Sequence, residues 1–565
     1  MPSLSIASLD KVPARRGAAV LLEVLHSEGV RHVFGNPGTT ELALMDALTA
    51  MPEIGYIWGL QEASVVAMAH GYAQAAGRAG FVNLHTAGGL GHAMGAMLNA
   101  QVSGTPLVVT AGQQDTRHTL ADPLLSGDLT RIAGPAVKWA HEVAHPDHLP
   151  VLLRRAFHDC TAAPSGPVFL SLPMDVMEAT STAGIAEVSV IDRAAVAGSL
   201  DRLTDILAGI APGRLAIIAG DEIAASDASA ETVLLAEALG APVFGSSWPA
   251  CIPYPTAHPL WAGNLPTTAR EIHARLEPFE AVFALGGKSV ITLLYSEGSA
   301  VPPGCKVFQL TADVRDLGRT YSTALSMVGD IKASLKVLLP LLAGTLAHHQ
   351  DAIMTLRRAA ESGRSARRAE LHARAEAEFD APVTMPLVAA EQVVRAIGPH
   401  VAIVDEAVAT SLHVRSFLDS FSSRQYSFLR GGALGWGMPA SVGTSLGLGR
   451  EPVVCLVGDG AALYSPQALW TAANERLPVT FVVMNNREYN VLKNFMKAQP
   501  QYLSVRANRF IAMDLVDPPI DFLALAASMG IPARRVERAA DIAGAVEHGI
   551  ASGRPNLIEI PITAT

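Results

Sequence analysis

The side chains of Asp459 and Asn486 carry the most distinctive chemistry in this sequence. Asp459 stands in a Gly-Asp-Gly turn and Asn486 closes an Asn-Asn pair, and each motif follows an apolar run typical of a buried strand. A strand–turn–helix–strand order would bring both residues to the carboxyl-terminal edge of one parallel sheet, where such folds bind ligands. Carboxylate and amide oxygens suit Mg²⁺ or Ca²⁺, and free N–H groups at a helix start suit a phosphate. The two motifs therefore predict a site for a divalent cation and a diphosphate.

The strands that would position this site belong to a pattern that recurs along the chain. The two apolar runs are Val453–Val457 and Val479–Met484, and residues 466–475 between them have helical composition. The alternation predicts an α/β protein with three doubly wound parallel-sheet domains. Their expected ranges are 14–182 (N-terminal), 190–342 (middle) and 384–563 (C-terminal), with a charged, Ala-rich linker of helical character at 343–383.

Strands and helices can also be predicted within the first two domains. The N-terminal strands are expected at Arg31–Phe34, Gly55–Trp58, Gly80–Leu84, Leu107–Thr110 and Val168–Leu172, and helices are expected to begin near Thr40, Glu62 and Gly89. The middle strands are expected at Leu215–Ala219, Val243–Gly245, Ala281–Leu285 and Val307–Leu310.

Composition excludes several classes of function. The 565-residue chain has a net charge of −10 and no basic cluster interleaved with aromatic residues, which argues against binding to nucleic acid. Its four cysteines form no Cys-x-x-Cys motif, so neither a zinc site nor a disulfide framework is indicated. No apolar run approaches the length of a membrane span, and Asp10 and Lys11 precede the first apolar stretch, which makes a poor signal peptide. A cytoplasmic location without a membrane partner is the expectation.

The spaced Gly-Asp-Gly and Asn-Asn motifs resemble the signature of enzymes that use thiamine diphosphate. The resemblance extends to the benzoylformate decarboxylase branch of the 2-oxo acid decarboxylases through three further motifs: Gly35-Asn36-Pro37-Gly38-Thr39, Leu60-Gln61-Glu62 and Asn83-Leu84-His85-Thr86. It implies a pyrimidine-binding, a middle and a diphosphate-binding domain, with thiamine diphosphate and Mg²⁺ (or Ca²⁺) as cofactors.

The same resemblance assigns cofactor contacts to residues of the C-terminal domain. Asp459, Asn486 and the main-chain carbonyl of Glu488 match the metal ligands, the carbonyl of Gly432 would receive the 4′-amino group, and Leu434 would wedge the cofactor into its bent shape. The remaining expected contacts are Thr410, Gly458, Gly460 and Ala461.

Glu62 has two possible roles. Taken alone, it fits an acidic residue at a helix start, favoured by the helix dipole. The resemblance instead assigns it the hydrogen bond to N1′ of the aminopyrimidine, supplied from a partner subunit. It therefore implies a homodimer at least, with a homotetramer expected.

The resemblance also implies the substrate pocket. Thr39 would contact the substrate carboxylate and His85 would handle protons, while Val491 and Phe495 would shape the pocket. The family's second histidine is missing, because Leu293 falls at its expected place. Losing a proton carrier would favour capture of the intermediate by a second aldehyde.

The expected function is non-oxidative decarboxylation of a benzoylformate-like 2-oxo acid to an aldehyde through an enamine on the cofactor, with carboligase side activity. The first alternative is an acetolactate-synthase-like or benzoin-type C–C ligase. FAD, which often accompanies that branch, is not expected, because Gly220-Asp221 and Gly286-Gly287 form no dinucleotide fingerprint. The remote alternative is a non-catalytic assembly module with the same fold.

Overall fold

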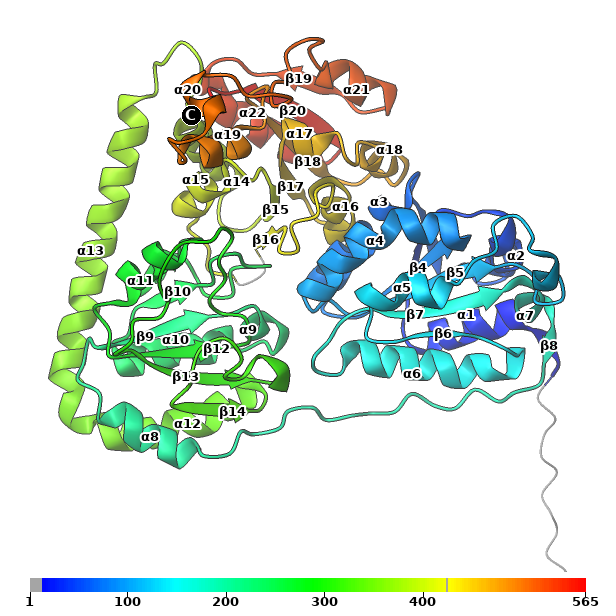
Figure 1. Ribbon diagram of the computed structural model, residues 1–565, viewed down its shortest axis with the longest axis horizontal. Helices are drawn as coiled ribbons and strands as arrows, with labels where there is room; N and C mark the ends of the chain where they lie inside the picture. The colour runs from blue at the N-terminus through cyan, green and yellow to red at the C-terminus, as the bar shows by residue number, and fades with distance from the viewer. Residues whose placement is uncertain (1–12, 423–424, 565) are drawn as a thin grey trace, which may run out of the picture. The chain divides into compact units, whose positions relative to one another are not determined.

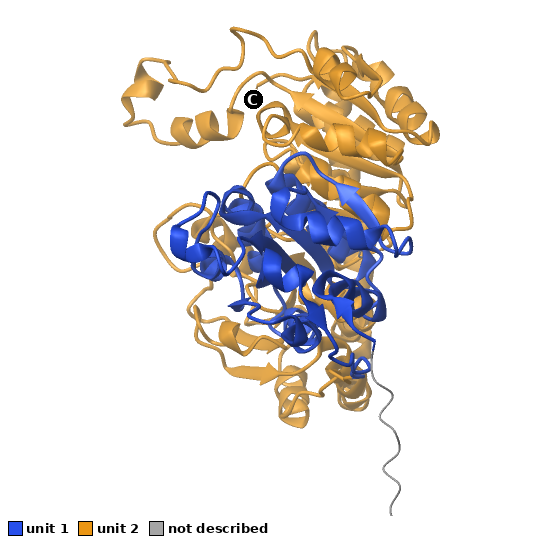
Figure 2. Ribbon diagram, turned by 90° about the vertical axis from the view of Figure 1, so that its right-hand side faces the viewer, with its two compact units in different colours: residues 1–190 blue, residues 191–565 orange. Residues whose placement is uncertain are grey.

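Three parallel sheets of six strands each organise the chain in the computed structural model (Figure 1). The structure describes residues 13–422 and 425–564, so Asp10 and Lys11 of the charged N-terminus lie outside the described residues. The predicted fold class, with three doubly wound parallel sheets, is confirmed. The chain divides into two compact units, 1–190 and 191–565, so the middle and C-terminal sheets share one unit (Figure 2).

The N-terminal sheet has the order β3-β2-β4-β5-β7-β6. Its central strands are apolar and buried almost throughout, as expected for a parallel sheet covered on both faces. The helix after β4 begins at Thr86 rather than near Gly89, because the chain turns into the helix directly after His85. The strands are β2 (His32–Gly35), β3 (Gly55–Trp58), β4 (Gly80–His85), β5 (Leu107–Gln113), β6 (Ala140–Glu142) and β7 (Val168–Pro173), and the helices include α1 (Gly17–Ser27), α2 (Leu42–Leu48), α3 (Glu62–Ala76), α4 (Thr86–Val102) and α6 (Leu149–Thr161).

The middle sheet has the order β11-β10-β9-β12-β13-β14. Three of its four predicted strands have the expected bounds, and the fourth, β13, is one residue longer at each end. The strands are β9 (Leu215–Ala219), β10 (Val243–Gly245), β11 (Trp261–Asn264), β12 (Ala281–Leu285), β13 (Lys306–Thr311) and β14 (Leu325–Val328). The helices include α8 (Leu200–Ala208), α9 (Glu222–Ala225), α10 (Ser229–Leu239), α11 (Ala269–Leu276) and α12 (Ile331–Thr345).

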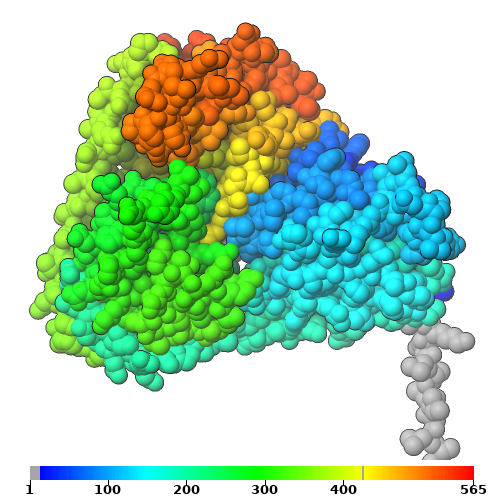
Figure 3. Space-filling view, viewed as in Figure 1, coloured from blue at the N-terminus to red at the C-terminus, as the bar shows by residue number. Residues whose placement is uncertain are grey.

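A long helix, α13 (Gln350–Ala377), lies in the segment expected to be a helical linker. It packs on α10 of the middle sheet and α14 of the C-terminal sheet, and only Ile353 and Ala375 are buried along its length, so much of its surface is exposed (Figure 3). By length and composition, the stretch Ile331–Ala377 is apolar enough to cross a membrane. Its apolar half, α12, buries Leu335, Leu338 and Leu342 in the core beneath the middle sheet, as core helices do.

The C-terminal sheet has the order β16-β15-β17-β18-β20-β19. Its strands are β15 (Ala402–Glu406), β16 (Tyr426–Phe428), β17 (Val453–Gly458), β18 (Val479–Asn485), β19 (Ala533–Arg535) and β20 (Asn556–Pro561). The helices include α14 (Pro386–Ile397), α15 (Ser411–Phe417), α16 (Gly437–Gly447), α17 (Asp459–Ala462), α18 (Gln467–Asn474), α19 (Asn490–Lys497), α21 (Phe522–Ser528) and α22 (Ala539–Ala551). Strands β17 and β18 are neighbours, with Gly458 opposite Met484, so the two predicted ligand motifs leave the sheet side by side.

Candidate active site

Asp459 and Asn486 line one cavity at the carboxyl-terminal edge of the C-terminal sheet. The cavity has a volume of about 240 Å³, and Leu434, Thr410 and Val491 also line it. The turn from β17 into α17 contributes Gly458, Gly460 and Ala461 to its wall. The structure therefore brings together the expected cofactor-binding residues of this domain except Gly432, which is not among the described residues that line the cavity. They come from four separate stretches of the sequence.

Asp459 is a buried carboxylate at the start of a helix. Its side chain accepts hydrogen bonds from the backbone N–H of Gly460 at 2.8 Å and of Arg487 at 2.6 Å. Burial nevertheless raises the pKa of Asp459 to about 6, because the ionised form loses its hydration and only N–H dipoles replace it. A divalent cation beside this carboxylate would stabilise the ionised form.

Asn486 and Glu488 supply the remaining expected ligand atoms. Asn486 Oδ1 accepts a hydrogen bond from Glu488 N at 3.1 Å. The carboxylate of Glu488 forms an ion pair with the buried amine of Lys493, which also reaches Asp514 at 2.5 Å. Lys493 already engages the side chain of Glu488. The main-chain carbonyl of Glu488 is therefore the atom of this residue that would be offered to a metal.

The donor set fits a cation shared with a diphosphate. Among the described residues, no group of three His, Cys, Asp or Glu side chains could hold a metal ion by itself. One carboxylate and one amide oxygen are, however, the sparse protein contribution with which Mg²⁺ is usually bound alongside phosphate oxygens. The residues present therefore fit a metal diphosphate better than a bare metal.

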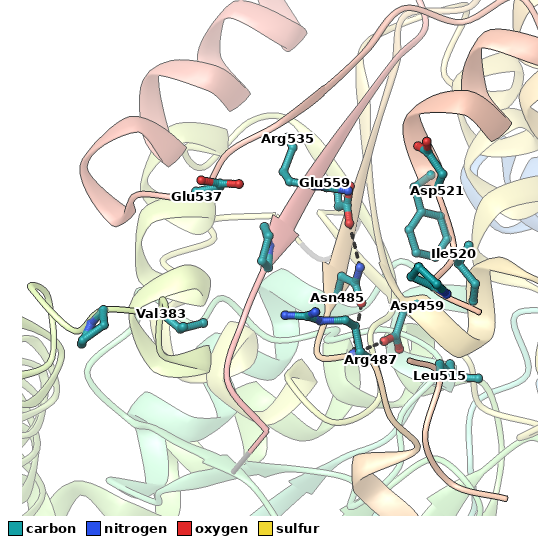
Figure 4. A pocket seen from close by; sticks show the side chains of 14 residues that line it. Val383, Asp459, Asn485, Arg487, Leu515, Ile520, Asp521, Arg535, Glu537 and Glu559 are labelled. Carbon is teal, nitrogen blue, oxygen red and sulfur yellow. Dashed lines mark hydrogen bonds and ion pairs between the residues drawn. The ribbon is translucent and has the colours of Figure 1, made fainter. Parts of the chain in front are cut away.

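The first asparagine of the pair faces a different cavity. Asn485 donates from Nδ2 to Glu559 Oε1 at 2.7 Å, and Glu559, which is 1% exposed, also accepts from Arg535 (Figure 4). These residues line a second cavity of about 560 Å³, to which Asp459 and Arg487 also contribute. Successive side chains of a strand point in opposite directions, so Asn485 anchors the sheet while Asn486 faces the first cavity.

Glu406 organises the glycine-rich loop that carries Leu434. Its fully buried carboxylate accepts hydrogen bonds from the N–H groups of Gly435 at 2.7 Å, Trp436 at 3.1 Å and Gly437 at 2.7 Å. Burial raises the pKa of Glu406 to about 7. The loop also needs glycine at two positions, because Gly432 and Gly435 have φ of +81° and +94°. We did not assign Glu406 a role from sequence, although an acidic residue ending a strand at this edge was a usable signal.

Other expected residues of this unit are placed less directly. Thr410 lines the cavity, but its hydroxyl donates to Ala407 O at 2.9 Å and so closes its own turn. Leu293 follows β12 and is 47% exposed. Leu293 and Phe495 are not among the described residues that line the cavity.

Glu62 is the first residue of α3 in the N-terminal unit and is 9% exposed. Its Oε1 accepts a hydrogen bond from Asn36 Nδ2 at 3.1 Å, and its Oε2 lies 3.2 Å from His92 Nδ1. A Cβ on Gly89 would lie 3.1 Å from Glu62 Cγ, so the glycine lets α4 pass close to this carboxylate. Polar partners thus hold Glu62 in one place at the carboxyl-terminal edge of its sheet.

His85 ends β4 at the same edge and is held by a carboxylate that sequence reasoning did not assign. Glu41, 2% exposed, places Oε2 2.9 Å from His85 Nδ1 and accepts from the N–H groups of Gly38 and Gly112. A carboxylate at Nδ1 favours the tautomer that leaves Nε2 available for proton transfer. Thr39 itself is exposed. The hydroxyl of its neighbour, Thr40 Oγ1, lies 3.1 Å from His85 Nδ1.

The equivalent edge of the middle sheet is occupied by the chain itself. Glu222, the first residue of α9, accepts hydrogen bonds from Gly287 N at 2.9 Å, Thr311 Oγ1 at 2.6 Å and Ala312 N at 3.1 Å. The backbone donors that follow β12 and β13 are therefore engaged within the protein.

Comparison with known proteins agrees with this geometry. Three family models match: the N-terminal binding domain of thiamine pyrophosphate enzymes at residues 15–132, their central domain at 203–338 and their C-terminal binding domain at 409–560. Benzoylformate decarboxylase of Pseudomonas aeruginosa is 32% identical over 551 residues, which cover 95% of this chain and 97% of the relative. The large subunit of acetolactate synthase isozyme 3 of Escherichia coli is 25% identical and covers 85% of this chain and 83% of its own.

Solved structures of similar proteins lead to the same family. The thiamine diphosphate-dependent 4-hydroxybenzoylformate decarboxylase of Rhodococcus jostii RHA1 matches with a TM-score of 0.85 and 28% identity, covering 98% of this chain and 100% of its own. Benzoylformate decarboxylase of Polynucleobacter necessarius matches with a TM-score of 0.85 and 26% identity, and the match covers 98% of this chain and 99% of that one. The chain therefore belongs to the family of thiamine pyrophosphate enzymes that includes the benzoylformate decarboxylases.

Proposed function

We propose that this protein decarboxylates an aryl 2-oxo acid of the benzoylformate type and releases the corresponding aldehyde. The observation that carries the proposal is the cavity in which Asp459, Asn486 and Leu434 converge from separate stretches of the chain. Its oxygen donors suit a Mg²⁺ diphosphate. The names of the relatives support an aryl substrate, since benzoylformate and 4-hydroxybenzoylformate decarboxylases match nearly the whole chain.

The bound cofactor would supply an electron sink for the bond to the departing carboxylate. Asp459, Asn486 and the carbonyl of Glu488 would hold the diphosphate through Mg²⁺, and the loop held by Glu406 would present Leu434 and the Gly432 carbonyl. Glu62, oriented by Asn36 and His92, would hold the proton exchanged with the pyrimidine ring. We propose that Glu62 acts in the site of a neighbouring subunit, within a homodimer that pairs further into a homotetramer.

The substrate side of the proposal rests on His85 and Thr39. His85 is supported through Nδ1 by Glu41, which leaves Nε2 to accept and return a proton. Thr39 is exposed next to it and can donate a hydroxyl to a substrate carboxylate. FAD has no part in this proposal, and the carboxylate of Glu222 in the middle sheet supports leaving it out.

The experiment measures CO₂ release from benzoylformate, 4-hydroxybenzoylformate and pyruvate, with and without thiamine diphosphate and Mg²⁺. We expect turnover that needs both additions and that is faster for the aryl acids than for pyruvate. Preference for pyruvate with 2-acetolactate as product would favour the acetolactate-synthase-like alternative. Cofactor binding without CO₂ release from any of the acids would contradict the proposal and favour the non-catalytic alternative.

We also propose a carboligase side activity, favoured by Leu293. A leucine cannot donate a proton, and release of the aldehyde requires one. A mixture of benzaldehyde and acetaldehyde should therefore give 2-hydroxyketones, and Leu293→His should shift the product ratio toward free aldehyde. The matched control is Leu294→His, a change at a neighbour that is similarly exposed (44% against 47%). An equal shift in both variants, or no ligated ketone from the unchanged protein, would contradict this part.

A further inference from the structure

A third cavity of the larger unit, here called the arginine cavity, has a strongly basic lining. It has a volume of about 450 Å³ and lies among β11, α11, α13 and α15. Its lining includes six arginines and a single carboxylate, Glu370. The arginines are Arg275 of α11, Arg364, Arg367, Arg368 and Arg374 of α13, and Arg415 of α15.

The arginines form a graded series from the rim to the floor. Arg275, Arg367 and Arg374 are exposed at the rim. Arg364 and Arg368 are partly buried and share one acidic partner, Asp419. Asp419 Oδ1 lies 3.7 Å from Arg368 Nη1 and closer to Arg364 Nη2. Three carboxylates face the six guanidinium groups: Glu370 in the lining, Asp419 beside Arg364 and Arg368, and the buried Asp405, whose charge interacts with that of Arg415. The cavity therefore keeps an excess of positive charge in a chain whose net charge is −10.

Arg415 on the floor is the strongest indication that a ligand belongs here. The residue is 7% exposed, its Nε donates to Ser411 O at 3.3 Å, and its guanidinium lies 5.0 Å from the centre of the Phe428 ring. Its buried Nη1 has no hydrogen-bond partner among the described residues. A buried charged donor left without a partner is costly, and an anion in the cavity would satisfy it.

A solvated helix face is the alternative explanation for the arginines of α13. Elsewhere on this helix that explanation holds, because Arg357 pairs with Glu237 and Arg358 is exposed. It does not explain why Arg275 and Arg415, from two other helices, converge on the same cavity. Like charges gathered from three elements repel one another unless a counter-ion neutralises them.

We propose that this cavity binds a small molecule through a triphosphate group. Guanidinium forks bind phosphate oxygens in pairs, and a set of six can neutralise several linked phosphates. The volume lies within the range of small-molecule sites, and the apolar wall formed by Trp261, Leu371 and Leu412 can accept a nucleoside. Two sources share this chemistry, a nucleoside triphosphate and inorganic triphosphate.

The position of the cavity links it to the cofactor site. Leu412 and Arg415 of α15 line the arginine cavity, whereas Ala407 and Thr410, just before α15, line the cofactor cavity. Ser411 connects the two, because it accepts from Arg415 and donates to the buried carboxylate of Asp405 at 2.9 Å. An occupant of the arginine cavity would thus touch α15, the helix that directly follows the turn lining the cofactor cavity.

The experiment is calorimetric titration of the holoenzyme, saturated with thiamine diphosphate and excess Mg²⁺, with ATP, inorganic triphosphate and adenosine. We expect saturable binding of both triphosphates, weakened by salt, and none of adenosine. Equal affinities for ATP and inorganic triphosphate would mean that the cavity recognises the phosphates alone. Tighter binding of ATP would mean that it also contacts the nucleoside. No saturable binding of either triphosphate to the unchanged protein would overturn the proposal.

Variants on the surface test the location without disturbing the fold. The double change Arg367→Ala/Arg374→Ala should weaken triphosphate binding about tenfold or more, because two charge-assisted contacts are lost. Asp419→Ala should strengthen it, since Arg364 and Arg368 lose a competing acid. Arg358→Ala removes the same charge from α13 outside the cavity and should leave the affinity unchanged. Equal affinities in the double variant and in Arg358→Ala would overturn the proposal.

Discussion

The middle and C-terminal sheets are both parallel sheets of six strands, but different groups contact the backbone at their carboxyl-terminal edges. In the middle sheet, Glu222 accepts the N–H groups that follow β12 and β13. In the C-terminal sheet, Asp459 and Asn486 follow β17 and β18 and line a cavity. The carboxyl-terminal edge of a parallel sheet is a general ligand site. It can accept a ligand only where no carboxylate of the chain itself already accepts the backbone N–H groups there.

The N-terminal sheet shows an intermediate arrangement. Glu41 accepts the N–H groups of Gly38 and Gly112, as Glu222 does in the middle sheet, and it also holds His85. In this sheet the carboxylate of Glu41 supports His85, a candidate catalytic side chain, and does not close the edge. Four substitutions test this difference between filled and open edges.

The largest effect is expected for Asp459→Asn at the open edge. Loss of the buried charge should weaken binding of thiamine diphosphate with Mg²⁺ by about 100-fold or more, since even indirect partners of a metal are worth about 10- to 100-fold. Calorimetric titration of the cofactor measures this change. The control is Asp521→Asn, which makes the same change of charge in the neighbouring cavity and keeps a good helix cap. Its affinity for thiamine diphosphate should match that of the unchanged protein. Similar losses in both variants would show that the open edge is not the cofactor site.

The next effect is expected for Glu41→Gln at the edge that supports His85. Misplacement of a catalytic group by about 1 Å can cost about 100-fold in rate, so we expect kcat to fall by up to about that factor. Cofactor affinity should stay the same. Steady-state kinetics with the best 2-oxo acid measures this. The control is Glu142→Gln, which removes the carboxylate that accepts a hydrogen bond from Ser171 in the same sheet. A kcat unchanged in Glu41→Gln would mean that His85 needs no such support.

A local effect on stability is expected for Glu222→Ala at the filled edge. The N–H groups of Gly287 and Ala312 would lose their acceptor, at a cost of about 2 kcal/mol, or about 30-fold faster amide exchange. Hydrogen–deuterium exchange of the peptides that contain these two residues measures it. Cofactor affinity should not change, and a large loss of affinity would contradict the distinction between the two edges.

The last prediction is a change in the pH dependence of stability for Glu406→Gln. The pKa of Glu406 is raised from 4.5 to about 7 by burial, so the folded protein holds a proton there that the unfolded chain releases. The resulting stabilisation is complete below pH 4.5 and is lost as the pH rises through about 7. Thermal unfolding between pH 5 and pH 8 should therefore show the unchanged protein losing stability relative to Glu406→Gln as pH rises. Parallel curves for the two proteins would contradict this.

The parts of the site that lie next to strands were predictable from sequence. The runs Val453–Val457 and Val479–Met484 become β17 and β18, each only one residue longer. Strand neighbourhood then followed from the single helical crossover between them. Asp459 and Asn486 therefore share one edge for a reason that is local in sequence.

The supporting carboxylates were not predictable in the same way. Glu41, Glu222 and Glu406 act on backbone donors far along the chain, such as Gly112, Ala312 and Gly435. Hydrophobic periodicity finds a strand but does not reveal which loop will fold over its end. Leu293 shows the same limit, because its expected place opposite the substrate depends on how the loop after β12 folds. The backbone N–H of Leu293 donates to Thr267 O at 2.9 Å, which does not fix where its side chain lies.

Asn485 is the last residue of β18 and Asn486 follows it directly, so the same substitution, Asn to Asp, should have opposite consequences at the two positions. Converting either amide to an acid alters the same atoms, yet Asn485→Asp would set two carboxylates against each other at Glu559, whereas Asn486→Asp would add a charge beside the cation. A shift of the strand by one residue would exchange these duties. Both roles therefore depend on the alignment of β18 with its neighbours, and an insertion between Val479 and Asn486 should disturb the sheet anchor and the cofactor cavity together.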